Sequence, residues 1–178
     1  GQETEANESA KQFASAAGSL SFPAMLSGDV VSGSMRHGLF ALFFVGFGVK
    51  AGLIPFHVWL PEAHPAAPSP ISALMSGVLI KVGIYGIFRV CVAGLGPPPL
   101  AWGGLVLAVG AVSMVLGVLY ALMQHDLKRL LAYHSIENIG IILVAAGVGM
   151  ISLAIGRPGL AVVALAASLL RVLNNALL

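Results

Sequence analysis

Charged side chains are scarce in this 178-residue chain. Only 9% of its residues are charged and 58% are hydrophobic, whereas ordinary soluble domains carry roughly 25% charged residues. So few charges cannot cover a water-facing surface, and the net charge of +2 is too small to indicate nucleic-acid binding. The composition excludes a soluble domain and predicts an integral membrane protein that has the lipid bilayer, and no nucleic acid, as a partner.

Cysteine is almost absent as well. The single Cys91 excludes an internal disulfide, and no cysteine cluster, phosphate loop, haem motif or nucleophile elbow occurs. We therefore expect no cofactor and no metal on this chain. No apolar run begins before about residue 38, so a signal peptide is not expected. The sequence starts with Gly1 and stops inside an apolar run at Leu178, which predicts an excerpt of a longer protein.

Long apolar runs are what the sequence does contain. A helix needs about 20 residues to cross a hydrocarbon core of about 30 Å. Residues 1–34 lack such a run and are expected to form an extramembrane loop. The remaining residues, 35–178, predict an all-α, polytopic transmembrane helical bundle. Its five expected spans are residues 35–54, 70–93, 100–123, 127–151 and 158–178.

Prolines concentrate between the first two expected spans. Proline removes a backbone donor and clashes with the preceding helical turn. Five of them forbid one continuous helix here: Pro55, Pro61, Pro65, Pro68 and Pro70. Non-helical backbone at membrane depth is tolerated where it lines a cavity. The spacing therefore predicts a broken or non-helical connection over residues 53–69, facing a cavity.

Ionisable residues lie deep inside four of the five expected spans. With a rise of about 1.5 Å per residue, Lys81 and Glu137 lie roughly 15 Å from the start of their helices. Lys50 and Arg171 lie deep in two others. Each such residue costs about 2.5–3.5 kcal/mol, so a functional role is the default expectation. Two structural alternatives stay open: Lys50 reaches the interface by snorkelling, or Lys81 and Glu137 form a permanent ion pair.

The fourth span is the richest in polar residues. His134 and Glu137 are three residues apart and share a helical face with Asn138. An imidazole beside a carboxylate is the chemistry that a proton path requires. His57, in the proline-rich stretch, is a further candidate proton carrier. An alternative is a membrane-embedded enzyme that uses His57, Glu62 and His64 as acid, base or metal ligands.

Three motifs carry a resemblance to a known family. They are GVKAGLIPFHVWLPEAH at 48–64, GVLIKVGIYG at 77–86 and DLKRLLAYHSIENIG at 126–140. Together they resemble the antiporter-like, proton-translocating subunits of respiratory complex I. That family also includes cation/proton antiporter subunits and membrane-bound hydrogenases, and the resemblance covers residues 36–178. The segment HSIEN at 134–138 is most similar to the hydrogenase-4 and formate hydrogenlyase branch.

The resemblance implies a proton-translocating membrane subunit of a redox-driven complex, with no redox active site on this chain. Arg171 and Asn175 stand where relatives have histidines, and because arginine cannot release its proton, both are expected only to modulate the relay. The implied relay residues are Lys50, Lys81, Glu137, His134 and His57.

The resemblance also implies partners and a location. Other membrane subunits and hydrophilic redox subunits are expected, with Fe–S and nickel–iron centres and quinone chemistry on those partners. The expected location is the cell (inner or plasma) membrane, which the chain crosses several times. A sodium/proton antiporter subunit without a redox partner is the alternative, and a purely structural membrane subunit is a third.

Overall fold

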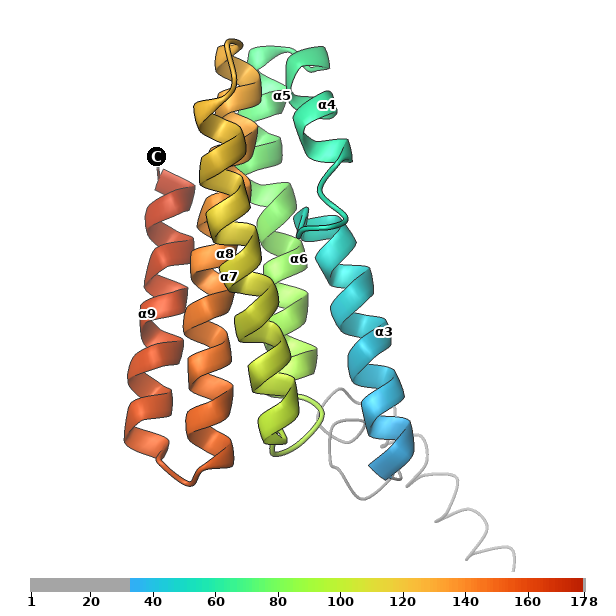
Figure 1. Ribbon diagram of the computed structural model, residues 1–178, viewed down its shortest axis with the longest axis vertical. Helices are drawn as coiled ribbons and strands as arrows, with labels where there is room; N and C mark the ends of the chain where they lie inside the picture. Colours follow the sequence, from blue (N-terminus) through green and yellow to red (C-terminus); the bar gives the residue numbers. More distant parts are fainter. Residues whose placement is uncertain (1–32, 178) are drawn as a thin grey trace, which may run out of the picture.

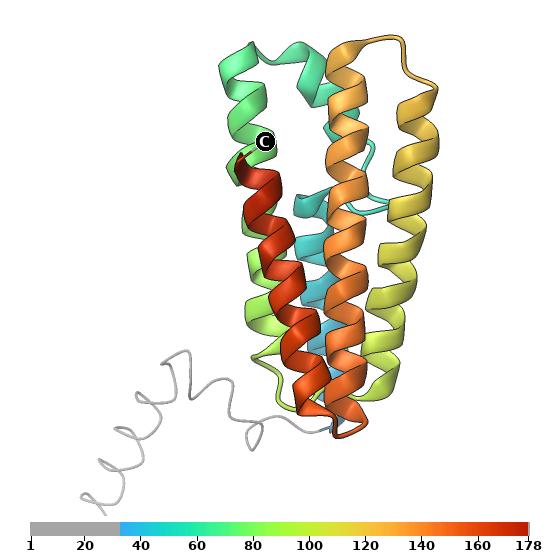
Figure 2. The same cartoon turned by 90° about the vertical axis from the view of Figure 1, so that its left-hand side faces the viewer.

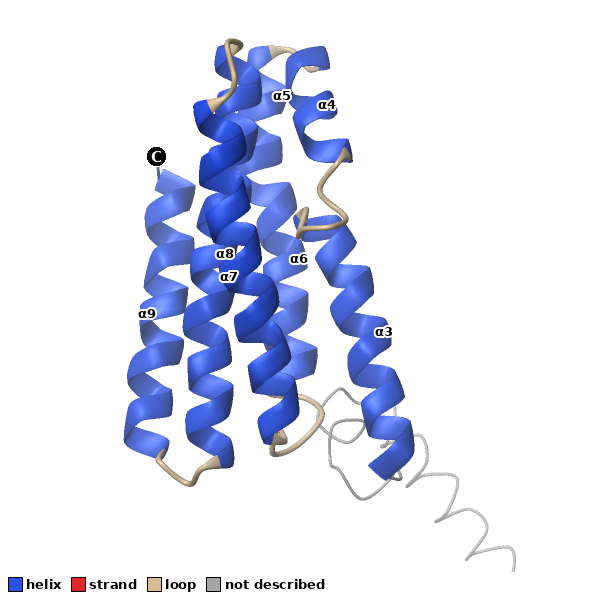
Figure 3. Ribbon diagram, viewed as in Figure 1, coloured by secondary structure: helices blue, strands red, loops and turns tan. Residues whose placement is uncertain are grey.

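The computed structural model describes residues 33–177, and all the regular structure within them is helical (Figures 1 and 3). The predicted all-α bundle is confirmed. Of the expected loop 1–34, the last two residues belong to the first described helix, and the others lie outside the described residues. The helices are α3 (Gly33–Ala51), α4 (Trp59–Ala66), α5 (Ser69–Leu74), η1 (Met75–Leu79), α6 (Ile80–Gly86), η2 (Ile87–Val92), α7 (Leu100–Leu122), α8 (Leu127–Ala154) and α9 (Pro158–Leu177).

The long helices run side by side along one axis (Figures 1 and 2). One end of the bundle holds the α4–α5 and α7–α8 turns. The other end, which we call the α3-start end, holds the beginning of α3, the η2–α7 loop and the α8–α9 turn. Helix α8 packs against both α7 and α9, while α3 packs against α6 and η2. The far end of α9 lies beside η1 (Figure 2).

Within residues 33–177, four helical stretches are long and apolar enough to cross a membrane, so the chain is a membrane protein. They are Ser69–Val92, Leu100–Leu122, Leu127–Ala154 and Pro158–Asn175. The first expected span does form a helix, α3, but α3 carries Arg36 and Lys50 in 19 residues and is not among these four. The ends of the observed helices differ from the expected ones by up to three residues.

The proline-rich stretch breaks the helix as predicted. Gly52 has φ of 76°, a left-handed conformation that glycine adopts without steric cost and that commonly closes helices. The Leu53 amide donates to Gly48 O at 3.0 Å and closes the last turn of α3. Helix α4 then begins at Trp59 and accommodates Pro61 and Pro65 in less than three turns. Helix α3 therefore ends about halfway along the bundle (Figure 1).

Two π-helical stretches interrupt the span from Ser69 to Val92. They are η1 and η2, and they flank the short helix α6. In η1 the Ile80 amide donates to Met75 O, five residues back. The sequence predicted an uninterrupted helix here. Such π turns are rare and occur frequently at functional sites.

Glycines bring the backbones of α7 and α8 into direct contact. A Cβ on Gly110 would lie 2.8 Å from the amide nitrogen of Val144, and one on Gly147 would lie 2.7 Å from that of Leu107. On Gly140 a Cβ would collide with the backbone of Met114. Small residues allow this approach, and close packing is what drives helix association in membranes. The pair α7–α8 is the tightest seam of the bundle.

The Gly140→Ala substitution is expected to destabilise the protein by about 1–3 kcal/mol, because the added methyl group has only backbone to displace. The matched control is Gly104→Ala on α7, where a Cβ meets nothing within 4 Å. This control should be neutral or stabilising, since alanine favours helix by up to about 1 kcal/mol over glycine. Thermal unfolding of the detergent-solubilised protein measures both. Equal thermal unfolding midpoints for the two variants would contradict direct backbone contact between α7 and α8 at Gly140.

Candidate functional site

Lys81 lies half-buried in α6, directly after the first π turn. Its Nζ donates to Ser76 O at 2.5 Å and to Asn175 O at 3.2 Å. The change from five-residue to four-residue pairing in a helix leaves a carbonyl without an amide donor, and the lysine supplies a donor to Ser76 O. Both partners are carbonyl oxygens, and Lys81 has no carboxylate partner among the described residues.

The end of α9 joins the lysine to α8. Asn175 and Arg171 lie four residues apart, on one face of α9. The Arg171 Nη2 donates to Asn138 Oδ1 at 2.7 Å, and Asn138 Nδ2 donates to His134 O at 2.9 Å. The Nε of Arg171 is buried without a partner in the described part of the chain. These contacts link Lys81 to the polar stretch of α8 through the turn of α9 that contains Arg171 and Asn175.

His134 and Glu137 are in direct contact. The Nδ1 of His134 lies 2.7 Å from Oε2 of Glu137, and the two side chains are 54% and 20% exposed. Their three-residue spacing placed them on one face, and the short distance shows that they form a pair. The imidazole and the carboxylate are therefore held within hydrogen-bonding distance of each other by one helix.

Neither lysine contacts this pair directly. The sequence left open a permanent ion pair between Lys81 and Glu137. Within residues 33–177 no ion pair joins either lysine to Glu137. Lys81 is turned toward η1 and α9, and Lys50 is exposed in the last turn of α3 without a hydrogen bond or ion pair to a described residue. The direct contact is thus replaced by the longer link through α9.

His57 lies beside two tyrosine rings, which are themselves 5.5 Å apart. Its ring centroid is 6.1 Å from that of Tyr120 on α7 and 6.4 Å from that of Tyr133 on α8. Its Nδ1 is buried and has no partner among the described residues. The three rings thus connect the helix break, which holds His57, to helices α7 and α8. Tyr133 directly precedes His134 in the sequence.

Two contacts made by serine hydroxyl groups on the Lys81 helical stretch were not predicted from the sequence. The Nδ1 of His64 lies 2.6 Å from Ser72 Oγ, and the Oγ atoms of Ser76 and Ser135 are 3.0 Å apart. The four-residue spacing of Ser72 and Ser76 placed both on one face of an apolar helix, which was the available signal. Burial, and secondarily the charge of Lys128, lower the pKa of His64 below its ordinary value of 6.5.

The side chains of His57, Glu62 and His64 do not converge on one point. Glu62 is 70% exposed and contacts Arg129 at 3.4 Å. His64 is bonded to Ser72, and His57 lies against the tyrosine rings. In the described part of the chain no three His, Cys, Asp or Glu side chains gather closely enough to hold a metal ion. The alternative of a metal enzyme built on these three residues is therefore not supported.

Comparison with known proteins gives one family. Residues 12–170 match the family model described as NADH:quinone oxidoreductase/Mrp antiporter, transmembrane. The chain is 52% identical to hydrogenase-4 component B of Escherichia coli over 162 residues, which are 90% of this chain and 24% of that protein.

Two further relatives are named as subunits of other enzymes. Formate hydrogenlyase subunit 3 of Escherichia coli is 44% identical over 133 residues, 75% of this chain and 22% of that protein. An NAD(P)H-quinone oxidoreductase chain 4 of a Synechococcus strain is 44% identical over 105 residues, 59% of this chain and 20% of that protein. The chain thus spans about a quarter or less of the length of these curated relatives.

Proposed function

Since the chain belongs to the NADH:quinone oxidoreductase/Mrp antiporter transmembrane family, we propose that it conducts protons within a redox-driven membrane complex. The complex would be of the hydrogenase-4, formate hydrogenlyase or NADH:quinone oxidoreductase type, as the names of its relatives suggest. The residues that carry the proton are Lys81 and the pair His134–Glu137, with Lys50 and His57 as further relay groups.

The hydrogen bonding of Lys81 is the observation that carries this proposal. A lysine in a fixed ion pair stays charged, because its carboxylate partner favours the ammonium form. Carbonyl oxygens, which are the partners of Lys81 here, accept from a neutral amine as well as from an ammonium group. Lys81 can therefore give up and regain a proton without losing its position. A permanent ion pair with Glu137 would not allow this.

Arg171 and Asn175 have a different role. Arginine stays protonated in proteins, so Arg171 contributes a fixed positive charge at the bridge between Lys81 and Asn138. That charge favours negative groups nearby and disfavours a second cation. Asn175 contributes its backbone oxygen to Lys81. Both residues tune the transfer and do not carry the proton.

The remaining parts of the function lie on other proteins. Electron transfer is assigned to hydrophilic partner subunits that hold Fe–S and nickel–iron centres, and neighbouring membrane subunits complete the proton path. The cell (inner or plasma) membrane is the proposed location. The alternative within the same family is a sodium/proton antiporter subunit that works without a redox partner.

Transport by everted membrane vesicles that contain the complex distinguishes the two proposals. Adding the electron donor (formate, hydrogen or NADH) should acidify the vesicle interior, and removing sodium should change the rate by less than about twofold. A protonophore should abolish the signal. Acidification that depends on a sodium gradient and proceeds without any electron donor would reject the redox-driven proposal in favour of the antiporter.

A further inference from the structure

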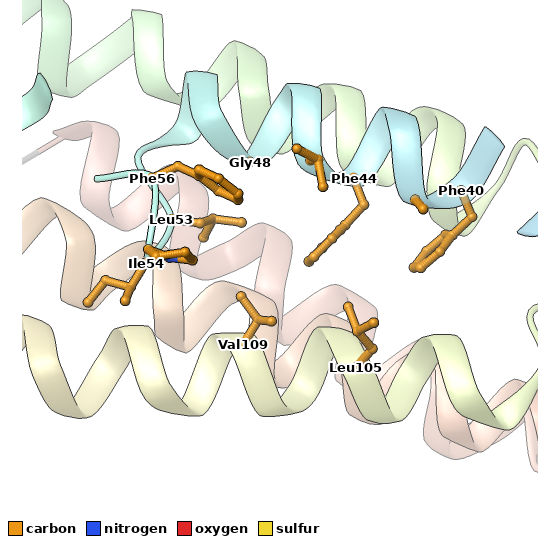
Figure 4. A pocket seen from close by; sticks show the side chains of 11 residues that line it. Phe40, Phe44, Gly48, Leu53, Ile54, Phe56, Leu105 and Val109 are labelled. Carbon is orange, nitrogen blue, oxygen red and sulfur yellow. The ribbon is translucent and has the colours of Figure 1, made fainter. Parts of the chain in front are cut away.

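An apolar groove runs between α3 and α7, outside the polar network described above (Figure 4). Its volume is about 250 Å³. It extends from the turn of α3 that contains Phe40 to the helix break at Leu53 and Phe56, and Leu105 and Val109 of α7 form its other wall. Every residue that lines it is apolar.

The groove has a rigid floor and an open rim. Phe40 stacks on Phe44 at 5.6 Å between ring centroids and on Trp102 at 4.3 Å, and both phenylalanines are less than 9% exposed. On the rim, Val45 and Leu105 are 44% and 46% exposed. The groove is therefore open along its length to whatever surrounds the α3–α7 face.

Just beyond the Phe40 end of the groove, one turn back along α3, the surface is polar and cationic. The guanidinium of Arg36 lies 5.6 Å from the ring of Trp102, and its Nη2 donates to Pro97 O at 3.1 Å. The remaining guanidinium donors have no partner among the described residues. The indole of Trp102 donates to His37 Nδ1 at 2.9 Å. Because indole only donates, the His37 ring carries its proton on Nε2, where it is a second available donor.

We infer that this groove binds one acyl chain of a membrane phospholipid whose phosphate contacts Arg36 and the Nε2 proton of His37. Eight residues separate Phe40 from Gly48, or roughly 12 Å of helix. That length fits within one leaflet of a hydrocarbon core of about 30 Å. The groove therefore spans the depth that an acyl chain occupies, and the cationic surface lies where the headgroup lies.

The size and charge of the site favour this occupant over others. Pockets for drug-sized molecules measure about 300–1,000 Å³, so a volume of about 250 Å³ fits a single narrow chain better than a ring system. An exposed apolar helix of another protein would not need a cationic surface. Arginine with free donors matches phosphate oxygens in charge and geometry, and tryptophan is enriched at the same membrane depth.

Photolabelling of the intact complex tests the inference. The complex is reconstituted into phosphatidylcholine vesicles that contain phosphatidylglycerol with a photoreactive diazirine in one acyl chain. After irradiation, mass spectrometry should find label on the α3 and α7 peptides that contain Val45 and Leu105. The Val45→Phe substitution fills the groove from its exposed rim and should lower this label about tenfold. Its control, Val49→Phe, lies on the exposed surface of α3 but does not line the groove, and should change the label less than twofold.

A second pair of variants tests the headgroup contact. The Arg36→Gln substitution removes the cation and should lower phosphatidylglycerol labelling about tenfold, as expected for one lost hydrogen bond to a charged group. Labelling by a diacylglycerol with the same diazirine chain should not change, because it has no phosphate. Arg157→Gln, at the same end of the bundle, is the control.

Three outcomes would overturn the inference. The first is equal labelling of the Val45→Phe and Val49→Phe variants. The second is the absence of label on α3 and α7 in the unaltered protein, which would mean that another segment of the complex covers the groove. The third is unchanged phosphatidylglycerol labelling of the Arg36→Gln variant. All labelling is measured without an electron donor, so the result does not depend on proton transport.

Discussion

The Lys81→Ala substitution is expected to lower proton translocation by the intact complex by about a hundredfold, the size of effect typical for loss of a positioned proton carrier. The complex should still assemble, because the substitution frees two carbonyl oxygens, Ser76 O and Asn175 O, and breaks no ion pair. The measurement is donor-driven acidification of everted vesicles, normalised to the amount of complex in the membrane.

Two further lysine variants make this result specific. The Lys81→Arg substitution keeps the positive charge but cannot release a proton, so it should be nearly as inactive as Lys81→Ala. Lys128→Ala is the matched control, because Lys128 also donates to a carbonyl oxygen, that of Ala67, but lies at the end of α8. It should retain at least about half of the activity. A fully active Lys81→Arg complex would show that Lys81 acts only as a fixed charge.

The second large effect is expected for Glu137→Gln. Glutamine keeps the shape of the side chain and can still bond to His134, but it does not titrate. If the pair His134–Glu137 passes protons, translocation should fall about a hundredfold while the complex assembles normally. If the pair only stabilises the fold, the main result should be poorer assembly, because glutamine does not carry the charge of Glu137 in its 2.7 Å contact with His134.

Glu62→Gln is the control for this carboxylate. Glu62 is 70% exposed and its contact with Arg129 measures 3.4 Å, and such surface pairs contribute only about 0–1 kcal/mol. The control should assemble and pump like the unaltered complex. A Glu137→Gln complex that does the same would exclude both the transport role and the structural role of Glu137.

The membrane helices were predictable because their signals are local. Apolar length set the spans, and residues such as Pro55 and Pro158 set their limits by steric rules that need no tertiary information. The two π stretches were not predictable in this way. The segment Met75–Leu79 has an ordinary helical sequence. Its π turn accompanies contacts with other helices, those of Ser76 with Ser135 on α8 and of Lys81 with Asn175 on α9.

In the candidate site, too, contacts within one helix were predictable and contacts between helices were not. The contact between His134 and Glu137 follows from three-residue spacing within one helix, and the sequence predicted that both share a face. The bond from Arg171 to Asn138 joins residues 33 positions apart, and it depends on how α8 and α9 are rotated about their axes. The partners of Lys81 depend on the same rotation. Residue spacing within one helix does not determine that rotation, because it depends on how the two helices pack.

The glycine seam between α7 and α8 also limits which parts of the molecule can move. Two backbones in direct contact cannot slide or turn against each other without first separating, because Gly110, Gly140 and Gly147 leave no side-chain layer to deform. We therefore expect α7 and α8 to move together as one rigid unit. In the proposed transport cycle, movement would fall instead on the turn at Gly52 and on the π-helical stretches η1 and η2 on either side of α6. Amide hydrogens should accordingly exchange fastest at those positions and slowest along the α7–α8 seam.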